Sequence, residues 1–556
     1  MKAGIKKHII NIVMPSVVLS MLVGAITGAI VFAFRVITEQ IIVISHGVYT
    51  FAGEHPWAIP IVGAGALAVA FLVSLCLVYS PHSRGGGIPT AVALMRGLIT
   101  FHWLRNIIFV FTSALFSYLC GIPLGNDEGP AVQMGTAVGS GTSRLTRHRG
   151  WERYLMTGGA TAGFATATCA PIAAVMFGLE EAHRRITPLL LISSITSVLS
   201  GMVTLRFFCF VTGKPELTSL FHFRLTEVLP LEKLWVAMLL GVLCGIGAYL
   251  FAKLTLKIRT VLHKTLKGLH PFFKVAPVFL LVAIVGCFFY ESIGTGHHLI
   301  ESLVEHRMVW YLALALLLVR ALLVILSNDV GATGGLFTPL LVFGALIGSM
   351  SAEALIAMGA LDEAYFPLLV VIGMSSFFSA SVRTPLTAAI FAVEVFSGLQ
   401  NLLPILVAIL VSYMIVEVIG VTSINEIAME RVIHQEHKGK RRKTVDVSLT
   451  ALPGSFAIGK EPRDILWPAF CHVLSVLEDE HDERDSYEGG VIHENNILRL
   501  NFTTYDADAT AAELCAILGD QPIYENAHIE TDAEGMKLSE RLPVRQRGET
   551  KENKRT

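Results

Sequence analysis

Residues 128–140 read EGPAVQMGTAVGS, and a little over 200 residues later residues 337–349 read FTPLLVFGALIGS. In both stretches four residues separate a proline from a glycine, and three more separate that glycine from a second glycine followed by serine. A proline near the start is typical of the first turn of a helix. The shared spacing predicts that the two stretches are equivalent parts of a repeated structure.

A second pair of segments repeats in the same order. Residues 171–180 (PIAAVMFGLE) and 385–394 (PLTAAIFAVE) keep proline, phenylalanine and glutamate at identical offsets. Two such coincidences favour two related halves, roughly residues 80–225 and 275–431, which in membrane transporters usually meet at a substrate site near the bilayer midplane. Chance repetition stays open as an alternative, because small residues recur in membrane helices for packing alone.

Charge is distributed unevenly along the 556 residues. Of the 43 Lys+Arg and 44 Asp+Glu, 39 lie in residues 432–556, which makes that part roughly 31% charged against roughly 11% before it. With 53% hydrophobic residues overall, an ordinary soluble protein is excluded. Residues 1–431 are predicted to lie in a membrane and the rest in water. The net charge of −1 gives no reason to expect a nucleic acid partner.

Several apolar runs are long enough to cross a bilayer, which takes about 20 residues. They are Ile9–Phe34, Trp57–Ser80, Leu234–Phe251, Trp310–Leu326 and Leu402–Val421. Four others are bounded by glycine or proline and are shorter than one crossing: Ile107–Gly121, Ala131–Ser143, Leu336–Gly348 and Leu386–Val395. Interrupted helices are tolerated at membrane depth only where their free backbone groups face protein or a polar cavity. This pattern predicts an all-α polytopic transporter or channel, an integral membrane protein in contact with lipid.

Three glycine-rich turns lead into a proline where a helix would begin: residues 85–89 (GGGIP), 125–130 (GNDEGP) and 334–339 (GGLFTP). The first N–H groups of a helix lack intrahelical partners, and the peptide dipoles add about half a positive charge there. Within a membrane such starts bind an anion without a full cation, so that the anion can also leave. The alternative is that they are only proline-initiated helices with glycine linkers.

Together with residues 382–394 (VRTPLTAAIFAVE), these motifs resemble the chloride-channel (CLC) family of anion channels and proton-coupled anion exchangers. The resemblance implies a fold of many tilted, often incomplete helices in two inverted halves, and a homodimer with one pore in each subunit. It also implies anion-binding positions, which in this sequence are Gly85, Gly86, Gly87, Ile88, Gly129, Leu336, Phe337, Thr338 and Asn425.

Glu128, directly before Gly-Pro, matches the family's gating glutamate, which occupies an anion position when ionised and leaves it when protonated. A carboxylate at a helix start competes for the same N–H groups as an anion, and protonation ends the competition. The alternative is an ordinary acid of the first helical turn.

Glu181 matches the glutamate that transfers protons on the inner side in the family's exchangers. Because it is followed by His183, Arg184 and Arg185, an ordinary interfacial ion pair is the alternative. Glu180 and Glu394 occupy equivalent repeat positions, which suggests a shared packing or hydrogen-bonding role.

The sequence departs from the family in three places. Gly86 and Asn425 replace a serine and a tyrosine whose hydroxyls commonly reach the central anion, although the Asn425 amide still donates hydrogen bonds. The gate loop has one extra residue, so that Asp127 either shares or perturbs the role of Glu128. The methionine typical of fluoride-exporting relatives is absent, which disfavours fluoride.

After a basic linker at residues 432–443, residues 444–540 alternate short apolar runs with polar turns and predict a small α+β domain. Residues 453–468 and 489–502 weakly resemble the C-terminal ligand module of potassium-uptake regulators, which implies a small-molecule ligand; a dimerising cap is the alternative. Residues 478–485 are interpreted as a solvated loop without a metal, and residues 541–556 as disordered.

The eight cysteines form no CxxC pair and are expected to pack as reduced apolar side chains. No cofactor or metal is expected, and neither HExxH nor GxSG motifs point to an enzyme.

The sequence therefore predicts exchange of chloride or a similar monovalent anion for protons, with Glu128 as the gate and Glu181 as the internal relay. The alternative within the same fold is a passive anion channel, and a third is a membrane scaffold or sensor that acts through its tail. Basic residues flanking the first and last spans predict both termini in the cytoplasm and a plasma or inner membrane location.

Overall fold

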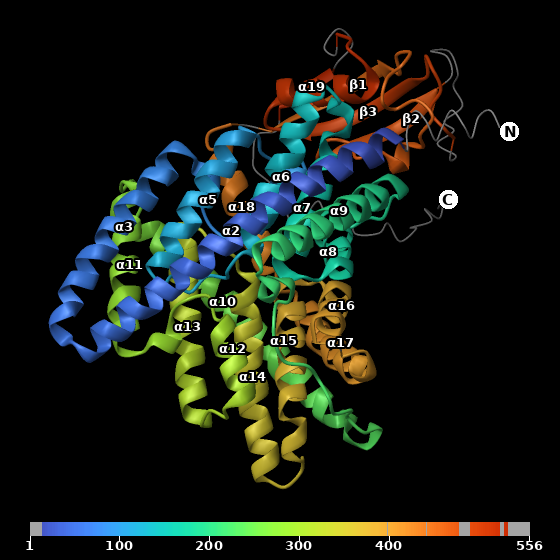
Figure 1. Ribbon diagram of the computed structural model, residues 1–556. Helices are drawn as coiled ribbons and strands as arrows, with labels where there is room; N and C mark the ends of the chain where they lie inside the picture. Colours follow the sequence, from blue (N-terminus) through green and yellow to red (C-terminus); the bar gives the residue numbers. More distant parts are fainter. Residues whose placement is uncertain (1–13, 397, 441, 478–489, 523–527, 532–556) are drawn as a thin grey trace, which may run out of the picture. The chain divides into compact units, whose positions relative to one another are not determined.

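The computed structural model describes residues 14–396, 398–440, 442–477, 490–522 and 528–531 (Figure 1). The chain divides into two compact units, Met1–Val432 and Ile433–Thr556. The interpretations of residues 478–485 as a solvated loop and of residues 541–556 as disordered fall outside the described residues.

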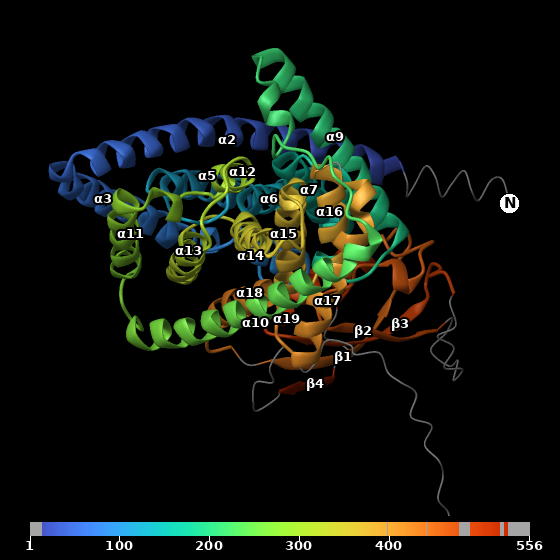
Figure 2. The same cartoon turned by 90° about the horizontal axis from the view of Figure 1, so that it is seen from below.

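The membrane unit is helical throughout. Its first half contains α2 (Met14–Glu54), α3 (Ile59–Tyr79), α4 (Ile88–Met95), α5 (Trp103–Leu119), α6 (Glu128–Leu145), α7 (Glu152–Thr168), α8 (Pro171–Phe177), which continues as a π-helical turn (Gly178–His183), and α9 (Pro188–Thr212). The second half contains α10 (Leu234–Thr265), α11 (Pro271–Phe288), α12 (His297–Glu305), α13 (Trp310–Val330), α14 (Phe337–Ala357), α15 (Phe366–Val382), α16 (Pro385–Phe396), α17 (Leu402–Ile419) and the first nine residues of α18 (Ile424–Glu436), which continues past Val432. Figure 2 shows the long α2 and α10 along two edges of this unit, with α6, α7, α14 and α15 drawn between them.

Among the described residues, nine helices are long and apolar enough to cross a membrane. The segments expected to be short remain so in α5 and α16, which have 17 and 12 residues. The prediction for Leu336–Gly348 was wrong, because α14 continues through strong helix formers to Ala357 and reaches 21 residues. The first span is likewise longer than expected, since α2 has 41 residues.

The repeated glycines have the same function in both halves. A Cβ built on Gly135 of α6 would lie 2.0 Å from the carbonyl oxygen of Gly159 in α7. A Cβ built on Gly344 of α14 would lie 2.3 Å from the carbonyl oxygen of Gly373 in α15. Any side chain would therefore separate the two helices of each pair. The equivalent packing confirms that the sequence repeat is a structural one.

The C-terminal unit is the small α+β domain expected from the sequence. Its strands are β1 (Lys443–Thr450), β2 (Cys471–Leu477), β3 (Ile497–Thr504) and β4 (His528–Thr531), in the order β2-β3-β1-β4 with antiparallel pairing. Alternate residues of β1 and β3, such as Val447 and Leu500, join Leu514 of α19 (Ala507–Leu518) in one apolar core.

Lys460 is buried in the C-terminal unit beside the ring of Phe456, 3.7 Å from the ring centroid. Burial lowers the pKa of Lys460 from 10.5 to about 8, because the charged form loses its hydration. Between these two values the unfolded chain binds more protons than the folded one, so stability rises with pH across that window. We expect Lys460→Met to stabilise the unit at pH 7 by roughly 1–3 kcal/mol.

The measurement for Lys460→Met is the free energy of opening from amide hydrogen exchange on β1 and β3 in the full chain. The advantage over the unchanged protein shrinks as the pH is raised towards about 10. An advantage that stays constant from pH 7 to 10 would contradict the explanation.

Candidate functional site

The three glycine-rich turns come together in the structure. Gly125 and Gly335 pair through two backbone hydrogen bonds, and the N–H of Gly334 donates to the carbonyl of Gly85 at 3.4 Å. A Cβ on Gly87, whose φ is +73°, would lie 2.3 Å from the carbonyl oxygen of Gly129. Only glycine allows backbones to approach this closely. The turns before α4, α6 and α14 therefore meet at one place.

Each of these turns ends in the first turn of a helix, with Gly87, Asp127 and Leu336 as the residues before α4, α6 and α14. The first N–H groups of each helix have no intrahelical acceptor, and each helix dipole adds partial positive charge. The convergence gathers these donors in a buried region. Such a region stabilises an anion through partial charges alone.

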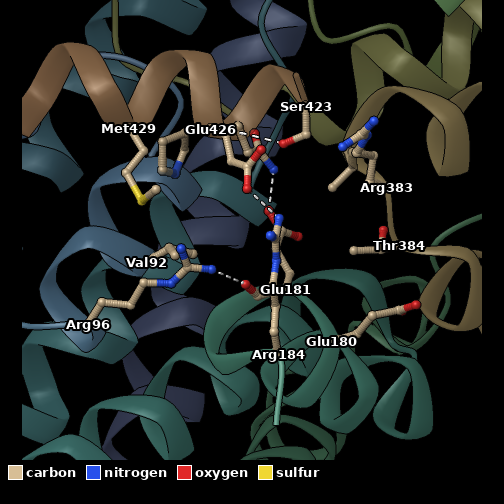
Figure 3. Close-up of a pocket in the computed structure, with 13 residues that line it drawn as sticks. Val92, Arg96, Glu180, Glu181, Arg184, Arg383, Thr384, Ser423, Glu426 and Met429 are labelled. Atoms are coloured by element: carbon tan, nitrogen blue, oxygen red, sulfur yellow. Dashed lines mark hydrogen bonds and ion pairs between the residues drawn. The ribbon is translucent and has the colours of Figure 1, made fainter. Parts of the chain in front are cut away.

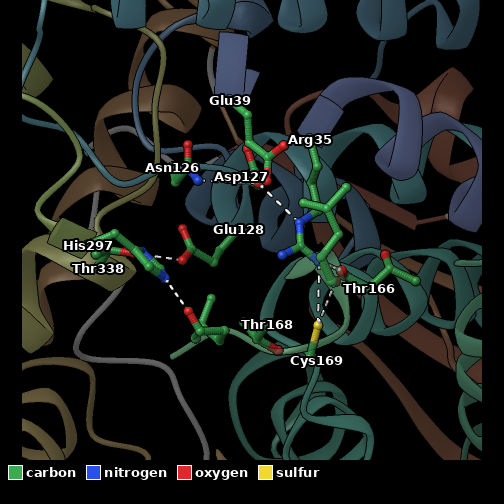
Figure 4. A network of polar contacts seen from close by, with 12 residues as sticks. Arg35, Glu39, Asn126, Asp127, Glu128, Thr166, Thr168, Cys169, His297 and Thr338 are labelled. Atoms are coloured by element: carbon green, nitrogen blue, oxygen red, sulfur yellow. Dashed lines mark hydrogen bonds and ion pairs between the residues drawn. The ribbon is translucent and has the colours of Figure 1, made fainter. Parts of the chain in front are cut away.

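Glu128 places a carboxylate at this junction. The residue is 1% exposed, and its Oε1 accepts a hydrogen bond of 2.6 Å from the hydroxyl of Thr338 in the first turn of α14 (Figure 4). Its Oε2 is buried and has no hydrogen-bond partner among the described residues. A Cβ on Gly125 or Gly335 would lie 3.3 or 3.6 Å from this oxygen. Thr338, expected among the anion-binding positions, holds this carboxylate in the structure.

Asp127 turns away from Glu128 and faces α2. Its carboxylate lies 3.5 Å from Nε of Arg35, and both side chains are at most 7% exposed. Arg35 also donates to the backbone carbonyls of Thr166 at 3.0 Å and Leu217 at 2.8 Å. The two acids of the gate loop therefore have different surroundings. Sequence reasoning missed Arg35, although a lone arginine in an apolar run is the signal that finds such a residue.

One cavity brings together side chains that lie far apart in the sequence. Ile88, Leu336, Phe337, Asn425 and Glu181 all line it. The rest of its wall is apolar and comes from Phe164, Phe177, Leu340, Phe378 and Val382. Gly86 lies behind this wall, since a Cβ there would contact the side chain of Leu336 at 3.4 Å.

Glu181 also lines a second cavity, which is rich in charge (Figure 3). Its carboxylate accepts a hydrogen bond from the amide of Asn425, and its backbone carbonyl accepts one of 2.9 Å from Arg96. Arg184 pairs with Glu426, and His183 bonds to the hydroxyl of Thr157. Arg184 and His183 thus make these contacts with groups other than the carboxylate of Glu181. Its carboxylate lies between the two cavities.

Glu180 and Glu394 make reciprocal helix caps. The Glu180 carboxylate accepts from the N–H groups of Leu386 and Thr387 at the start of α16, at 3.0 and 2.7 Å. The Glu394 carboxylate accepts from Ile172 and Ala173 at the start of α8, both at 2.9 Å. The shared hydrogen-bonding role expected from the repeat is confirmed.

We expect Glu394→Ala to lower the free energy of unfolding by about 1–2 kcal/mol, because two helix-start N–H groups lose their acceptor. Thermal unfolding in detergent measures this loss, and Glu180→Ala is the matched variant from the other half. Similar losses in both variants, with transport retained, support a purely structural role. Loss of transport by a stable Glu394→Ala protein would overturn it.

Within the described ranges there is no group of three or more His, Cys, Asp or Glu side chains that could hold a metal ion. All eight cysteines are free thiols, and five of them are buried.

Comparisons with known proteins find similar chains. The H(+)/Cl(-) exchange transporter ClcA of Vibrio campbellii is 28% identical over 377 residues, which is 66% of this chain and 77% of the relative. The protein of the same name from Salmonella paratyphi C is 25% identical over 439 residues, 77% of this chain and 90% of the relative.

Solved structures share the fold. A slow cyanobacterial Cl-/H+ antiporter has a TM-score of 0.69 at 23% identity, covering 76% of this chain and 99% of that protein. A eukaryotic CLC transporter has a TM-score of 0.63 at 17% identity, covering 85% and 82%.

The family model described as voltage gated chloride channel matches residues 64–417. This match spans more than half of the chain and includes all three glycine-rich turns. The protein therefore belongs to the voltage gated chloride channel (CLC) family.

Proposed function

We propose that the protein exchanges chloride or a similar monovalent anion for protons across a membrane. The observation that carries the proposal is the buried Glu128 carboxylate, which lies where the starts of α6 and α14 meet. An ionised carboxylate and a free anion compete for the same helix-start N–H groups. Protonation of Glu128 ends that competition, so one position links the two transported ions. The exchange activity named for the two ClcA relatives supports the same reading.

Glu181 is the proposed proton relay between the charged cavity and the apolar one. The residue is 9% exposed and lines both cavities. An acid in this position takes up a proton from the charged cavity and releases it towards the apolar one. Arg96, Arg184 and Arg383 line the charged cavity and would attract anions to its mouth.

The alternative is a passive anion channel, which is favoured by one specific feature. The GxGIP-type turn offers no hydroxyl at Gly86, and Asn425 is engaged with Glu181. An anion that is bound less tightly would cross the protein without the movement of a proton.

Purified protein in liposomes separates the two functions. An exchanger uses a chloride gradient to drive protons uphill, whereas a channel collapses the gradient without moving protons. Liposomes that lose chloride with no proton movement at any pH would refute exchange. Counterflow of chloride, bromide, nitrate and fluoride identifies the preferred anion.

A homodimer, cytoplasmic termini in a plasma or inner membrane, and a small ligand of the C-terminal unit complete the proposal. Mass measurement in detergent tests the homodimer. The accessibility of a cysteine added at residue 1 tests the side of the membrane on which the N-terminus lies. A ligand-dependent rise in melting temperature tests binding to the C-terminal unit.

A further inference from the structure

His297 is the first residue of α12. Among the described residues, one of its ring nitrogens has a hydrogen-bond partner and the other has none. Its Nε2 lies 2.8 Å from the backbone carbonyl of Leu220, and the ring of Phe221 stacks on it with centroids 4.5 Å apart. A carbonyl oxygen only accepts, so Nε2 carries a proton. The Nδ1 of a neutral ring is then an acceptor. This nitrogen is buried and has no hydrogen-bond partner among the described residues.

Glu128 has a buried oxygen that, like Nδ1 of His297, lacks a hydrogen-bond partner among the described residues. The Oε2 of Glu128 is this oxygen, and Figure 4 draws the His297 ring near the Glu128 carboxylate, whose charge acts on the ring. Leaving two polar atoms unsatisfied in the interior costs about 1–3 kcal/mol each. A proton shared between them would satisfy both. The two unpaired atoms, Nδ1 of His297 and Oε2 of Glu128, therefore indicate a place where a proton is held briefly during transfer.

His297 as a residue is more exposed than Glu128. The histidine is half-buried, whereas Glu128 is 1% exposed. One turn further along α12, Glu301 pairs with the exposed His222 at 3.0 Å, which indicates contact with water at this end of the helix. Burial opposes the charged form of the His297 ring and lowers its pKa, whereas Glu128 of α6 and Glu301 of α12 favour the charged form. Arg35 of α2 also opposes the charge.

We propose that His297 carries protons between the aqueous phase and Glu128. The proposal rests on the exchange function proposed above. In the transfer, the Nδ1–H bond of an imidazolium breaks and an O–H bond forms at Oε2 of Glu128, leaving a neutral ring and a neutral acid. A hydronium ion from the aqueous phase then protonates Nδ1 again, which restores the imidazolium and leaves a water molecule. The reverse order releases a proton from Glu128 to the same aqueous phase.

Exchange in liposomes tests this role, with His297→Gln as the variant and the adjacent, exposed His298→Gln as the matched control. A coupled exchanger that receives protons slowly turns over slowly, so proton and chloride fluxes should fall together by about 100-fold. The rate should depend less on pH than in the unchanged protein, because the titrating ring is gone. External imidazole should restore part of the flux of His297→Ala. His298→Gln should behave as the unchanged protein.

A double variant separates proton transfer from a structural role. In a Glu128→Gln background chloride moves without protons, so adding His297→Gln should leave the chloride flux unchanged. If His297→Gln slows that flux as well, or if it leaves exchange and its pH profile intact, the proposal is overturned. Failure of the unchanged protein to drive protons uphill would instead refute the exchange function itself, and the two outcomes are therefore distinct.

Discussion

Glu128→Gln should abolish uphill proton movement while chloride continues to cross the liposome membrane. Glutamine matches glutamate in size and keeps an oxygen that accepts the hydrogen bond from Thr338. It is permanently neutral, so it imitates the protonated gate and carries no proton. We expect proton flux to fall by at least about 100-fold, because loss of an acid–base group typically lowers a rate by that factor or more. Parallel recordings of pH and chloride from the same liposomes measure both effects.

Asp127→Asn is the control from the same loop. Asp127 faces Arg35 in a buried ion pair, and its removal leaves an uncompensated buried charge. Breaking such a pair typically destabilises a protein by about 3–5 kcal/mol. We therefore expect a lower melting temperature with proton coupling retained in the protein that stays folded. Loss of coupling in a stable Asp127→Asn protein would mean that the two acids share the gate, and loss of chloride flux in Glu128→Gln would contradict its gating role.

The parts of the site that sequence predicts are those whose physical requirement is local. The glycines and prolines of residues 85–89 and 334–339 indicate a close approach of backbones and the start of a helix. In the structure the two turns do lie together. The repeat added one long-range result, because equivalent positions implied equivalent roles for Glu180 and Glu394.

Partners that are distant in sequence could not be predicted from single residues. Arg35 and Asp127 lie 92 residues apart, and Thr338 and Glu128 lie 210 apart. Nothing in the local pattern indicates which side chain completes either contact, since tertiary packing decides it. The length of α14 was underestimated for a related reason: Gly348 resembles a boundary, yet its lack of a side chain serves contact with Leu369 and the helix continues past it.

Glu181→Gln should also stop proton movement and leave chloride flux in place. Its side chain would remain between the two cavities and could still meet Asn425 through its carbonyl oxygen, so the packing is preserved. What is lost is a group that binds and releases a proton, and no other acid lines the apolar cavity. Proton flux should again fall by at least about 100-fold, measured with the chloride flux in the same liposomes.

Glu180→Gln is the matched control, one residue away on the same π-helical turn. Its carboxylate caps α16, and the residue lines the charged cavity but not the apolar one, so its neutralisation should weaken the cap and spare the proton path. Equal loss of proton flux in both variants would show that the charge of the cavity matters and not a relay at Glu181. Retention of uphill proton movement by Glu181→Gln would require another route from the charged cavity to Glu128. The difference in proton flux between the Glu181→Gln and Glu180→Gln variants thus decides whether Glu181, which lines both cavities, carries the proton.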